Sequence, residues 1–446
     1  MTLFSDLDQH KRLFALALPM ILSNITVPLL GLVDTAVIGH LPHAYFLGGS
    51  TIGAMVISVT VWLFGFLRMS TTGLSAQALG RSDLSANLTV LLRGLSIAFI
   101  IGLSIILLQS PYINIALKLA GGSEEIQFYA SQYAHIRIWG VPAAMANLVI
   151  LGWLIGNQQS KTVLWLVILT NVINIALDIL FVFVFNWQVQ GIALASLIAE
   201  YSAMAMGILI IVNQYKVKLK ALCNNFNELS SRLFARHTLL HYFQLNRDIL
   251  IRTLCLQVCF LFITFMGARL GDNVVAANAI LMNFLLLISF GLDGIANAAE
   301  AMVGKSYGEK NTRKLAYIVR IALFWNVIFA LGYSLLFALA GESLLGLITN
   351  IDSIKVFAKD YLLWMILLPL VSCWCYLYDG VYIGLLQARV MRNSMIIATF
   401  GCFFPMWLIL QDFGNHGLWA AFSVFMLARG ITLAWHFHYR INAKSA

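Results

Sequence analysis

Three polar side chains lie on one face of an otherwise apolar segment, residues 163–185. Asn171, Asn174 and Asp178 stand at i, i+3 and i+7, the spacing that places side chains on one side of a helix. Either asparagine alone would most simply hydrogen-bond a neighbouring helix. A polar stripe that ends in a carboxylate is costly in an apolar setting, and it indicates an ion-binding pocket inside a helical bundle.

A second carboxylate, Asp34, reaches a similar depth from another apolar segment, residues 13–39. At about 1.5 Å per residue along a helix, Asp34 and Asp178 lie roughly 31 Å and 23 Å from the starts of their segments. Both acids are therefore expected in the same half of the bundle. Because a carboxylate that is removed from water holds its proton more tightly, we expect Asp34, Asn174 and Asp178 to couple the protein to protons.

The same side chains also carry ligands that a sodium ion accepts. Asp34, Asn174, Asp178 and Ser196 offer carboxylate, amide and hydroxyl oxygens, which are the ligands of hard cations. Oxygen chemistry alone does not separate the two ions, and we favour the proton. No other metal and no bound cofactor is expected.

Two prolines in segment 13–39, Pro19 and Pro28, each remove a helical hydrogen bond and favour a bend. Pro28 precedes Asp34 by less than two helical turns. We therefore expect protonation of Asp34 to change its partners and to bend this helix near Pro28.

These side chains belong to a chain made almost wholly of apolar segments. Of its 446 residues, 61% are hydrophobic and only 11% are charged, whereas about a quarter are charged in a soluble domain. Stretches long enough to cross about 30 Å of hydrocarbon recur from end to end, and helices satisfy the backbone there. We predict an all-α integral membrane protein with twelve transmembrane helices. They are expected near residues 13–39, 48–79, 88–109, 128–155, 163–185, 190–212, 249–268, 274–303, 315–339, 357–386, 394–411 and 416–438.

The chain repeats one six-helix unit at an offset of 226 to 228 residues. Residues 152–161 resemble residues 380–389, and Pro142 corresponds to Pro369. A nearly constant offset along the chain indicates two pseudo-symmetric six-helix lobes with the same orientation, and such lobes enclose a cleft whose access can alternate.

The repeat also sets the expected domain limits. We expect an N-terminal lobe over residues 1–212, a cytoplasmic linker over 213–247 and a C-terminal lobe over 248–446. The basic linker is expected to be a solvated connector, with an interfacial helix as the alternative.

The two lobes differ in their acids. At the repeat offset, Asp34 corresponds to Phe262 and Asp178 to Phe404 or Pro405. Because the equivalent positions are built without a carboxylate, the acids indicate a function located in the N-terminal lobe. Further candidates for a substrate cavity are Asn147, Asn171, Ser196, Glu200, Glu300 and Asp379.

Arginines also fall within the expected spans. Arg68, Arg252, Arg320 and Arg429 are expected near helix ends, where their long side chains can reach the polar interface. Arg137 lies inside the expected helix 128–155 and has no such explanation.

Charge distribution and motifs exclude other classes of protein. The net charge of +9 is spread through loops and gathers on the side of both termini. This pattern gives cytoplasmic termini by the positive-inside rule, and it does not form a patch for nucleic acid. The six cysteines show no metal-binding or disulfide spacing. No catalytic grouping stands in a loop large enough to house it, so we do not expect an enzyme.

The chain resembles the DinF-type branch of the multidrug and toxic compound extrusion (MATE) transporters over essentially its whole length. The resemblance rests on residues 18–40, LPMILSNITVPLLGLVDTAVIGH, and on residues 66–77, FLRMSTTGLSAQ. It extends to residues 171–178, NVINIALD, to residues 379–384, DGVYIG, and to residues 391–393, MRN.

The resemblance implies two V-arranged lobes of six helices in the bacterial inner membrane. It implies a secondary active exporter that exchanges organic, often cationic or amphipathic, compounds for H⁺ or Na⁺. It assigns coupling roles to Asp34, Asn174 and Asp178, a hydroxyl position to Ser196, and the helix bend to Pro19 rather than Pro28.

Two other functions within the same superfamily stay open as alternatives: a flippase for lipid-linked precursors and a carrier of organic anions or bile salts. A flippase for polyprenyl phosphates should line its cleft with several basic groups, whereas the deep charges of the first lobe include several acids. The expected partners are small organic substrates and membrane lipids, with the protein acting as a monomer.

Overall fold

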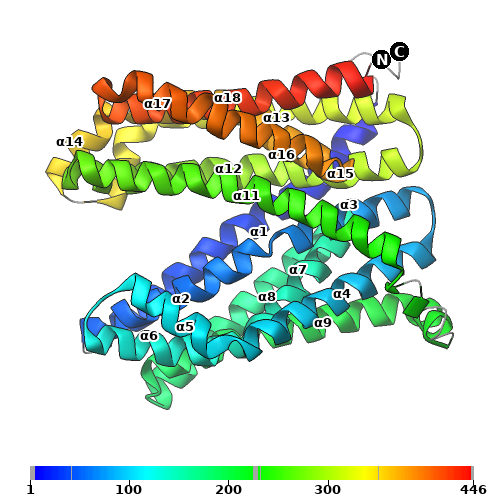
Figure 1. The fold of residues 1–446 in the computed structure, drawn as a ribbon, viewed down its shortest axis with the longest axis horizontal. Helices are drawn as coiled ribbons and strands as arrows, with labels where there is room; N and C mark the ends of the chain where they lie inside the picture. The colour runs from blue at the N-terminus through cyan, green and yellow to red at the C-terminus, as the bar shows by residue number, and fades with distance from the viewer. Residues whose placement is uncertain (1–5, 42, 225–229, 232, 350, 443–446) are drawn as a thin grey trace. The chain divides into compact units, whose positions relative to one another are not determined.

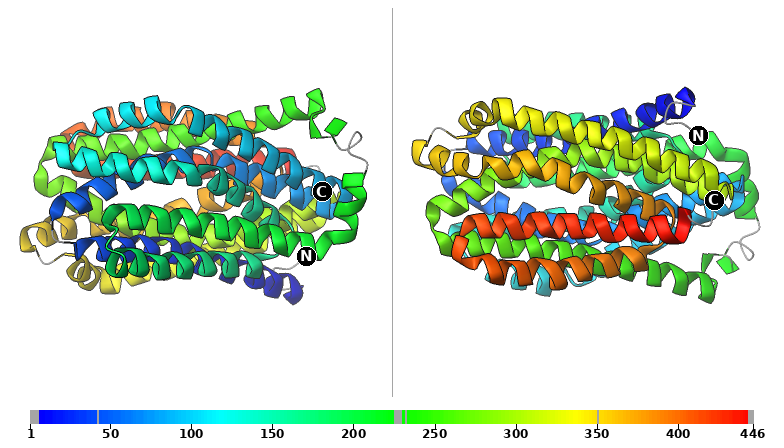
Figure 2. Two further views of the ribbon diagram at one scale, coloured as in Figure 1. Left: turned by 90° about the horizontal axis from the view of Figure 1, so that it is seen from below. Right: turned by 90° about the horizontal axis from the view of Figure 1, so that it is seen from above.

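The computed structural model of the chain describes residues 6–41, 43–224, 230–231, 233–349 and 351–442. Within these residues it contains helices and no strands (Figure 1). In the described part of the chain, twelve helical spans are long and apolar enough to cross a membrane, which confirms the predicted all-α class and the number of spans. Figure 2 shows from two further sides that the long helices of each half run side by side.

The first half of the chain begins with one long helix and ends with another. Its elements are α1 (Leu7–Gly39), α2 (Ala44–Leu63), α3 (Phe66–Gly80), α4 (Leu84–Leu107), α5 (Gln109–Ala120), α6 (Glu124–Arg137), the 3₁₀ turn η1 (Ile138–Gly140), α7 (Val141–Gly156), α8 (Ser160–Ile179), the π-helical turn η2 (Leu180–Val184) and α9 (Gln188–Asn224).

The second half repeats this order of long helices, with its breaks at other places. Its elements are α11 (Arg236–Leu270), α12 (Asp272–Gly308), α13 (Thr312–Ile348), α14 (Asp352–Asp360), α15 (Leu362–Gly384), α16 (Ala388–Ile396), the π-helical turn η3 (Ile397–Phe403), α17 (Phe404–Leu410), the 3₁₀ turn η4 (Gln411–Phe413), α18 (Asn415–His436) and η5 (Phe437–Asn442).

The chain forms two compact units. The N-terminal unit is Leu22–Tyr242, and the C-terminal unit is Met1–Ile21 together with Phe243–Ala446. Helix α1 therefore contributes to both units. In the C-terminal unit, Trp325 Nε1 donates to His10 Nδ1 at 3.0 Å. The rings of Phe14 and Trp325 pack edge to face, with their centres 4.6 Å apart. The lobe limits expected from the sequence stay a prediction.

Several expected spans are interrupted. The expected helix 48–79 is divided into α2 and α3 at residues 64–65, 128–155 is divided by η1, and 357–386 is divided at Tyr361 between α14 and α15. Pro142, at the second position of α7, accounts for the second break. It has no N–H for the carbonyl of Ile138, and its ring crowds that carbonyl.

The linker contains more helix than expected. Helix α9 continues to Asn224, with a bend at Tyr215 (φ −121°, ψ 21°), and α11 begins at Arg236. The Lys-, Leu- and Ala-rich sequence before Asn224 favours this continued helix, whose residues after 212 are mostly exposed. The expectation of a solvated connector stays a prediction. Residues 225–229 and 232 lie outside the described residues.

Equivalent turns confirm the six-helix repeat. Residues with left-handed backbone occur in three pairs separated by 228 positions: Ser82 and Lys310, Gln158 and Leu386, and Asn186 and Gly414, all with φ between 56° and 62°. Because non-glycine residues adopt this conformation rarely, its recurrence at one offset shows that the two halves share their loop geometry.

Helix crossings also recur at the same offset. A Cβ atom added at Gly152 in α7 would collide with the backbone carbonyl of Arg68 in α3, and one added at Gly380 in α15 would collide with that of Ala296 in α12. Both residue pairs are 228 positions apart. Small residues thus allow the same two backbones to approach closely in each unit.

We expect Gly152→Ala and Gly380→Ala to destabilise the protein, each by about 1–3 kcal/mol, because the added methyl group overpacks a backbone crossing. Gly332→Ala in α13 is the matched control, since nothing lies within 4 Å of its added Cβ. The measurement is the thermal unfolding midpoint of the full chain in detergent. Equal midpoints for all three variants would contradict the close crossings.

Candidate functional site

Asn174 joins the two acids of the N-terminal unit. With its amide nitrogen facing the carboxylates, Asn174 Nδ2 donates to Asp178 Oδ2 and to Asp34 Oδ1, both at 3.2 Å. Its oxygen then accepts from the backbone N–H and the hydroxyl of Ser196 at 3.1 Å each. This orientation satisfies every group around the amide, since carboxylate oxygens accept hydrogen bonds and need a donor opposite them.

The two carboxyl groups also lie within hydrogen-bonding reach of each other. Asp178 is fully buried and Asp34 half-buried, and Asp178 Oδ1 has no hydrogen-bond partner among the described residues. A hydrogen bond between two carboxyl groups requires a proton on one of them. The geometry is therefore suited to hold one proton between Asp34 and Asp178.

The polar face predicted for α8 is present, and its three members act differently. Asn174 and Asp178 face Asp34 on α1, as described above. Asn171, one turn before Asn174, instead donates from Nδ2 to the backbone carbonyl of Thr26 on α1 at 3.2 Å. Thr26 lies two residues before Pro28, so Asn171 holds α8 against α1 next to this proline.

Both prolines lie within a continuous helix. Helix α1 runs from Leu7 to Gly39 without a break, with Pro19 buried and Pro28 exposed. The boundary between the two compact units falls between them, after Ile21.

Arg137 pairs with Glu200. Arg137 Nη1 donates to Glu200 Oε2 at 2.9 Å and Nη2 to Oε1 at 2.8 Å, a two-point contact between partly buried side chains. Asn147 Nδ2 donates to the Glu200 backbone carbonyl at 2.9 Å. Arg137 also lies close enough to Asp34 to interact with its charge, so this pair adjoins the acid cluster.

The sequence identified both members of this pair without joining them. Arg137 and Glu200 carry opposite charges within apolar spans of one lobe, and the cost of an unpaired charge in lipid was the signal that predicts a partner. Of the two residues expected in a substrate cavity, Glu200 accepts from Arg137, and Asn147 donates to the backbone of Glu200.

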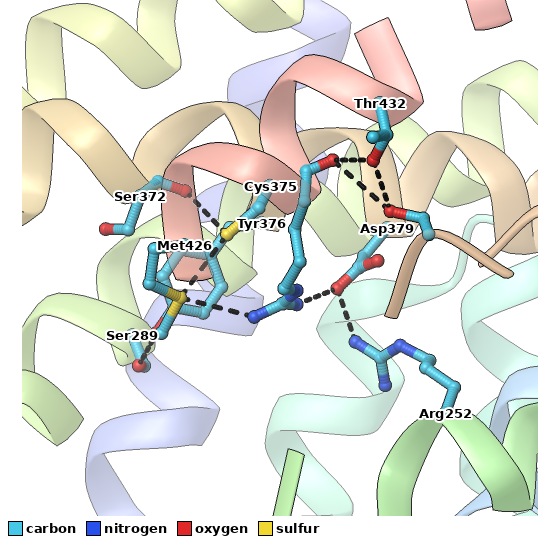
Figure 3. Close-up of polar contacts among 10 residues, drawn as sticks. Arg252, Ser289, Ser372, Cys375, Tyr376, Asp379, Met426 and Thr432 are labelled. Carbon is cyan, nitrogen blue, oxygen red and sulfur yellow. Dashed lines mark hydrogen bonds and ion pairs between the residues drawn. The ribbon is translucent and has the colours of Figure 1, made fainter. Parts of the chain in front are cut away.

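In the C-terminal unit, Asp379 receives two arginines (Figure 3). Asp379 Oδ2 accepts from Nη2 of Arg252 and, at 2.6 Å, from Nη2 of Arg429. Arg429 is almost completely buried, with Nη1 at 3.2 Å from Met426 Sδ and its guanidinium 5.3 Å from the centre of the Phe425 ring.

This cluster corrects the expectation for two arginines. Arg252 and Arg429 are buried, with 8% and 2% of their surface exposed, and do not extend to the polar interface. A carboxylate in reach compensates a guanidinium better than a long path to water. Glu300, also expected in a cavity, is 1% exposed in α12, beside the crossing where its carbonyl faces Gly384.

The family model MatE matches residues 19–180 and again residues 249–408, more than half of the chain. This chain belongs to the MatE family. The two matches fall on the two halves of the six-helix repeat. Members of this family are transporters and not enzymes, and the twelve spans make this one a multi-pass membrane protein.

Curated relatives resemble this MATE transporter along nearly its whole length. DNA damage-inducible protein F of Escherichia coli (strain K12) is 44% identical over 97% of this chain and 93% of its own. Multidrug resistance protein NorM of Vibrio cholerae serotype O1 is 21% identical over 95% of this chain and 94% of its own.

Solved structures share the fold. The crystal structure of MATE in the straight conformation superposes with a TM-score of 0.85 at 20% identity, covering 98% of this chain and 97% of that one. A MOP superfamily transporter from Pyrococcus furiosus superposes with a TM-score of 0.84 over the same shares of the two chains.

We expect the Arg137–Glu200 pair of this MATE transporter to show strong energetic coupling. Arg137→Gln or Glu200→Gln alone leaves a charge without its partner and should lower the free energy of unfolding by about 3 kcal/mol. The double variant should lose less than the sum of the two. The measurement is a double-mutant cycle on unfolding midpoints in detergent.

The exposed pair Lys359–Glu342, with Nζ and Oε1 at 2.8 Å, is the matched control. Water screens that pair, so its coupling should be below about 1 kcal/mol. Additive losses at Arg137 and Glu200 would show that the two charges do not depend on each other.

Proposed function

We propose that this MATE transporter is a secondary active multidrug exporter that exchanges organic, often cationic or amphipathic, compounds for protons. The observation that carries the proposal is the cluster of Asp34, Asn174 and Asp178, in which one amide donates to both carboxyl groups. The relatives named for multidrug resistance support the substrate class.

We propose the proton rather than Na⁺ as the coupling ion because two carboxyl groups in reach of each other can share a proton. The Asn174 amide suits this state when its nitrogen faces the two acids and its oxygen faces Ser196. The amide turned the other way would offer its oxygen to Na⁺, so separate ion gradients decide between the two ions.

Gain and loss of a proton change the charge of the site. With one shared proton the Asp34–Asp178 pair carries one negative charge, and without it two adjacent negative charges repel each other. The deprotonated pair attracts a cationic substrate, and proton entry removes part of that attraction. Proton binding and substrate release are thereby opposed in one site, as an exchanger requires.

The bend of α1 is the proposed mechanical response. Asp34 lies on the same helix as Pro19 and Pro28, and Asn171 holds the Thr26 carbonyl between the two prolines. A change in the partners of Asp34 is transmitted along α1 to positions that already lack a helical hydrogen bond.

The proposed location is the bacterial inner membrane, with both termini in the cytoplasm. The concentration of Lys and Arg on the side of the termini supports this orientation.

We expect Asp34→Asn and Asp178→Asn to abolish exchange. Each variant removes the shared proton site while keeping a side chain of similar size, so flux of a fluorescent organic cation should fall to that of vesicles without the protein. The measurement uses everted membrane vesicles with an imposed pH gradient. Asp412→Asn, at an exposed acid in η4, is the control and should transport normally.

The coupling ion is tested by separating the gradients. A pH gradient without sodium should drive transport, and a sodium gradient at equal pH should not. Transport driven by sodium alone and lost in Asp34→Asn would reverse the assignment of the ion. No flux of any compound dependent on Asp34 would exclude the exporter itself.

A further inference from the structure

The buried acid Asp248 of α11 contacts three arginines, two of which lie in the first turns of α16. Asp248 in α11, whose side chain is 2% exposed, lies 2.7 Å from Arg392 Nη1, 3.0 Å from Arg247 Nη2 and 3.9 Å from Arg389 Nε. Arg389 and Arg392 belong to α16. All four residues belong to the C-terminal unit, and none takes part in the proton site described above.

The positive charge of this cluster exceeds its negative charge. One carboxylate faces three guanidinium groups, which leaves two positive charges uncompensated within the cluster. Arg392 is fixed by Asp248 and by the Asn393 side chain, which accepts from its Nε and Nη2 at 3.1 and 2.9 Å. The side chains of Arg247 and Arg389 are 56% and 71% exposed, so two guanidinium groups are presented outward.

Helix α11 runs in the same direction as α16, η3 and α17 and lies beside them. Beyond the Asp248–Arg392 contact, Cys259 Sγ lies 3.8 Å from Thr399 Oγ1 in η3, and the centres of the Phe262 ring and the Trp407 ring in α17 are 5.9 Å apart. Later residues of α11 thus contact later residues of the second segment. The two segments are therefore neighbours from the arginines onward.

Both segments expose apolar side chains beyond the arginines. Leu254 and Val258 follow Arg247 at seven and eleven residues, on the same side of α11, and Ile397 and Phe400 lie in η3 beyond Arg389. At about 1.5 Å per residue, Leu254 and Val258 lie about 10 Å and about 16 Å along the axis from Arg247. These distances are within the reach of a lipid acyl chain whose headgroup lies at the arginines.

We propose that Arg247, Arg389 and Arg392, held by Asp248, bind the phosphate headgroup of an anionic phospholipid whose acyl chains lie along α11 and α16. Guanidinium groups match phosphate oxygens in two-point contacts, and basic groups between transmembrane helices recognise anionic headgroups. Charge complementarity selects an anionic lipid over a zwitterionic one, and the apolar face selects a lipid over a free phosphate.

The test is native mass spectrometry of the full chain in a neutral detergent, titrated with phosphatidylglycerol or with phosphatidylcholine of the same acyl chains. We expect phosphatidylglycerol to bind at lower concentration. Arg247→Gln and Arg389→Gln should each raise its half-saturating concentration about 5-fold, the share expected of one basic side chain near an anionic surface. Arg389→Lys should keep part of the affinity, because the charge is retained.

Arg269→Gln, an exposed arginine at the opposite end of α11, is the matched control and should bind as the wild type does. Equal binding of both lipids, or unchanged binding in Arg247→Gln and Arg389→Gln, would overturn the proposal. Displacement of the lipid by inorganic phosphate at equal concentration would overturn it too, because the acyl chains would then contribute nothing. Unfolding midpoints equal to that of the wild type establish that the variants remain folded.

Discussion

A charge inside an apolar bundle must have a partner, and this requirement organises the polar interior of the transporter. Arg137 meets Glu200 at two points, and Asp379 accepts from Arg252 and Arg429. Asp34 and Asp178 differ from these two acids, since their shared neighbour is the neutral amide of Asn174. Glu200 and Asp379 are compensated by arginine in direct contact, whereas the Asp34–Asp178 pair is the one that we propose to hold a proton.

The two units share their backbone arrangement but differ in the side chains that bind ions or other groups. The two units share loop geometry and backbone crossings at an offset of 228 residues, as Ser82 with Lys310 and Gly152 with Gly380 show. These shared features involve backbone atoms and small side chains. The acids Asp34 and Asp178 have no equivalent at this offset. The repeated residues therefore set the helix positions, and residues that differ between the units set what each unit binds.

Much of this could be predicted from the sequence, because the physical signals are local. Apolar length gave the twelve spans, helical spacing gave the face of Asn174 and Asp178, and the constant offset gave the repeat. Partners across helices were harder to predict. The sequence contains Arg252, Arg429 and Asp379 within the spans of one lobe, but helix rotation decides whether an arginine points to a carboxylate or to the interface. Breaks such as η1 were missed for a related reason, since proline is tolerated within α1 and α15 but stands at a break at Pro142 and at Pro405.

The first helix of each half is divided between the two compact units, so neither half of the sequence contains a whole unit. The start of α1, up to Ile21, belongs to the C-terminal unit, and the start of α11, up to Tyr242, belongs to the N-terminal unit. The two halves of the sequence therefore exchange their opening segments. A cut in the linker would not yield two self-sufficient modules, because each fragment would carry away a piece of the other.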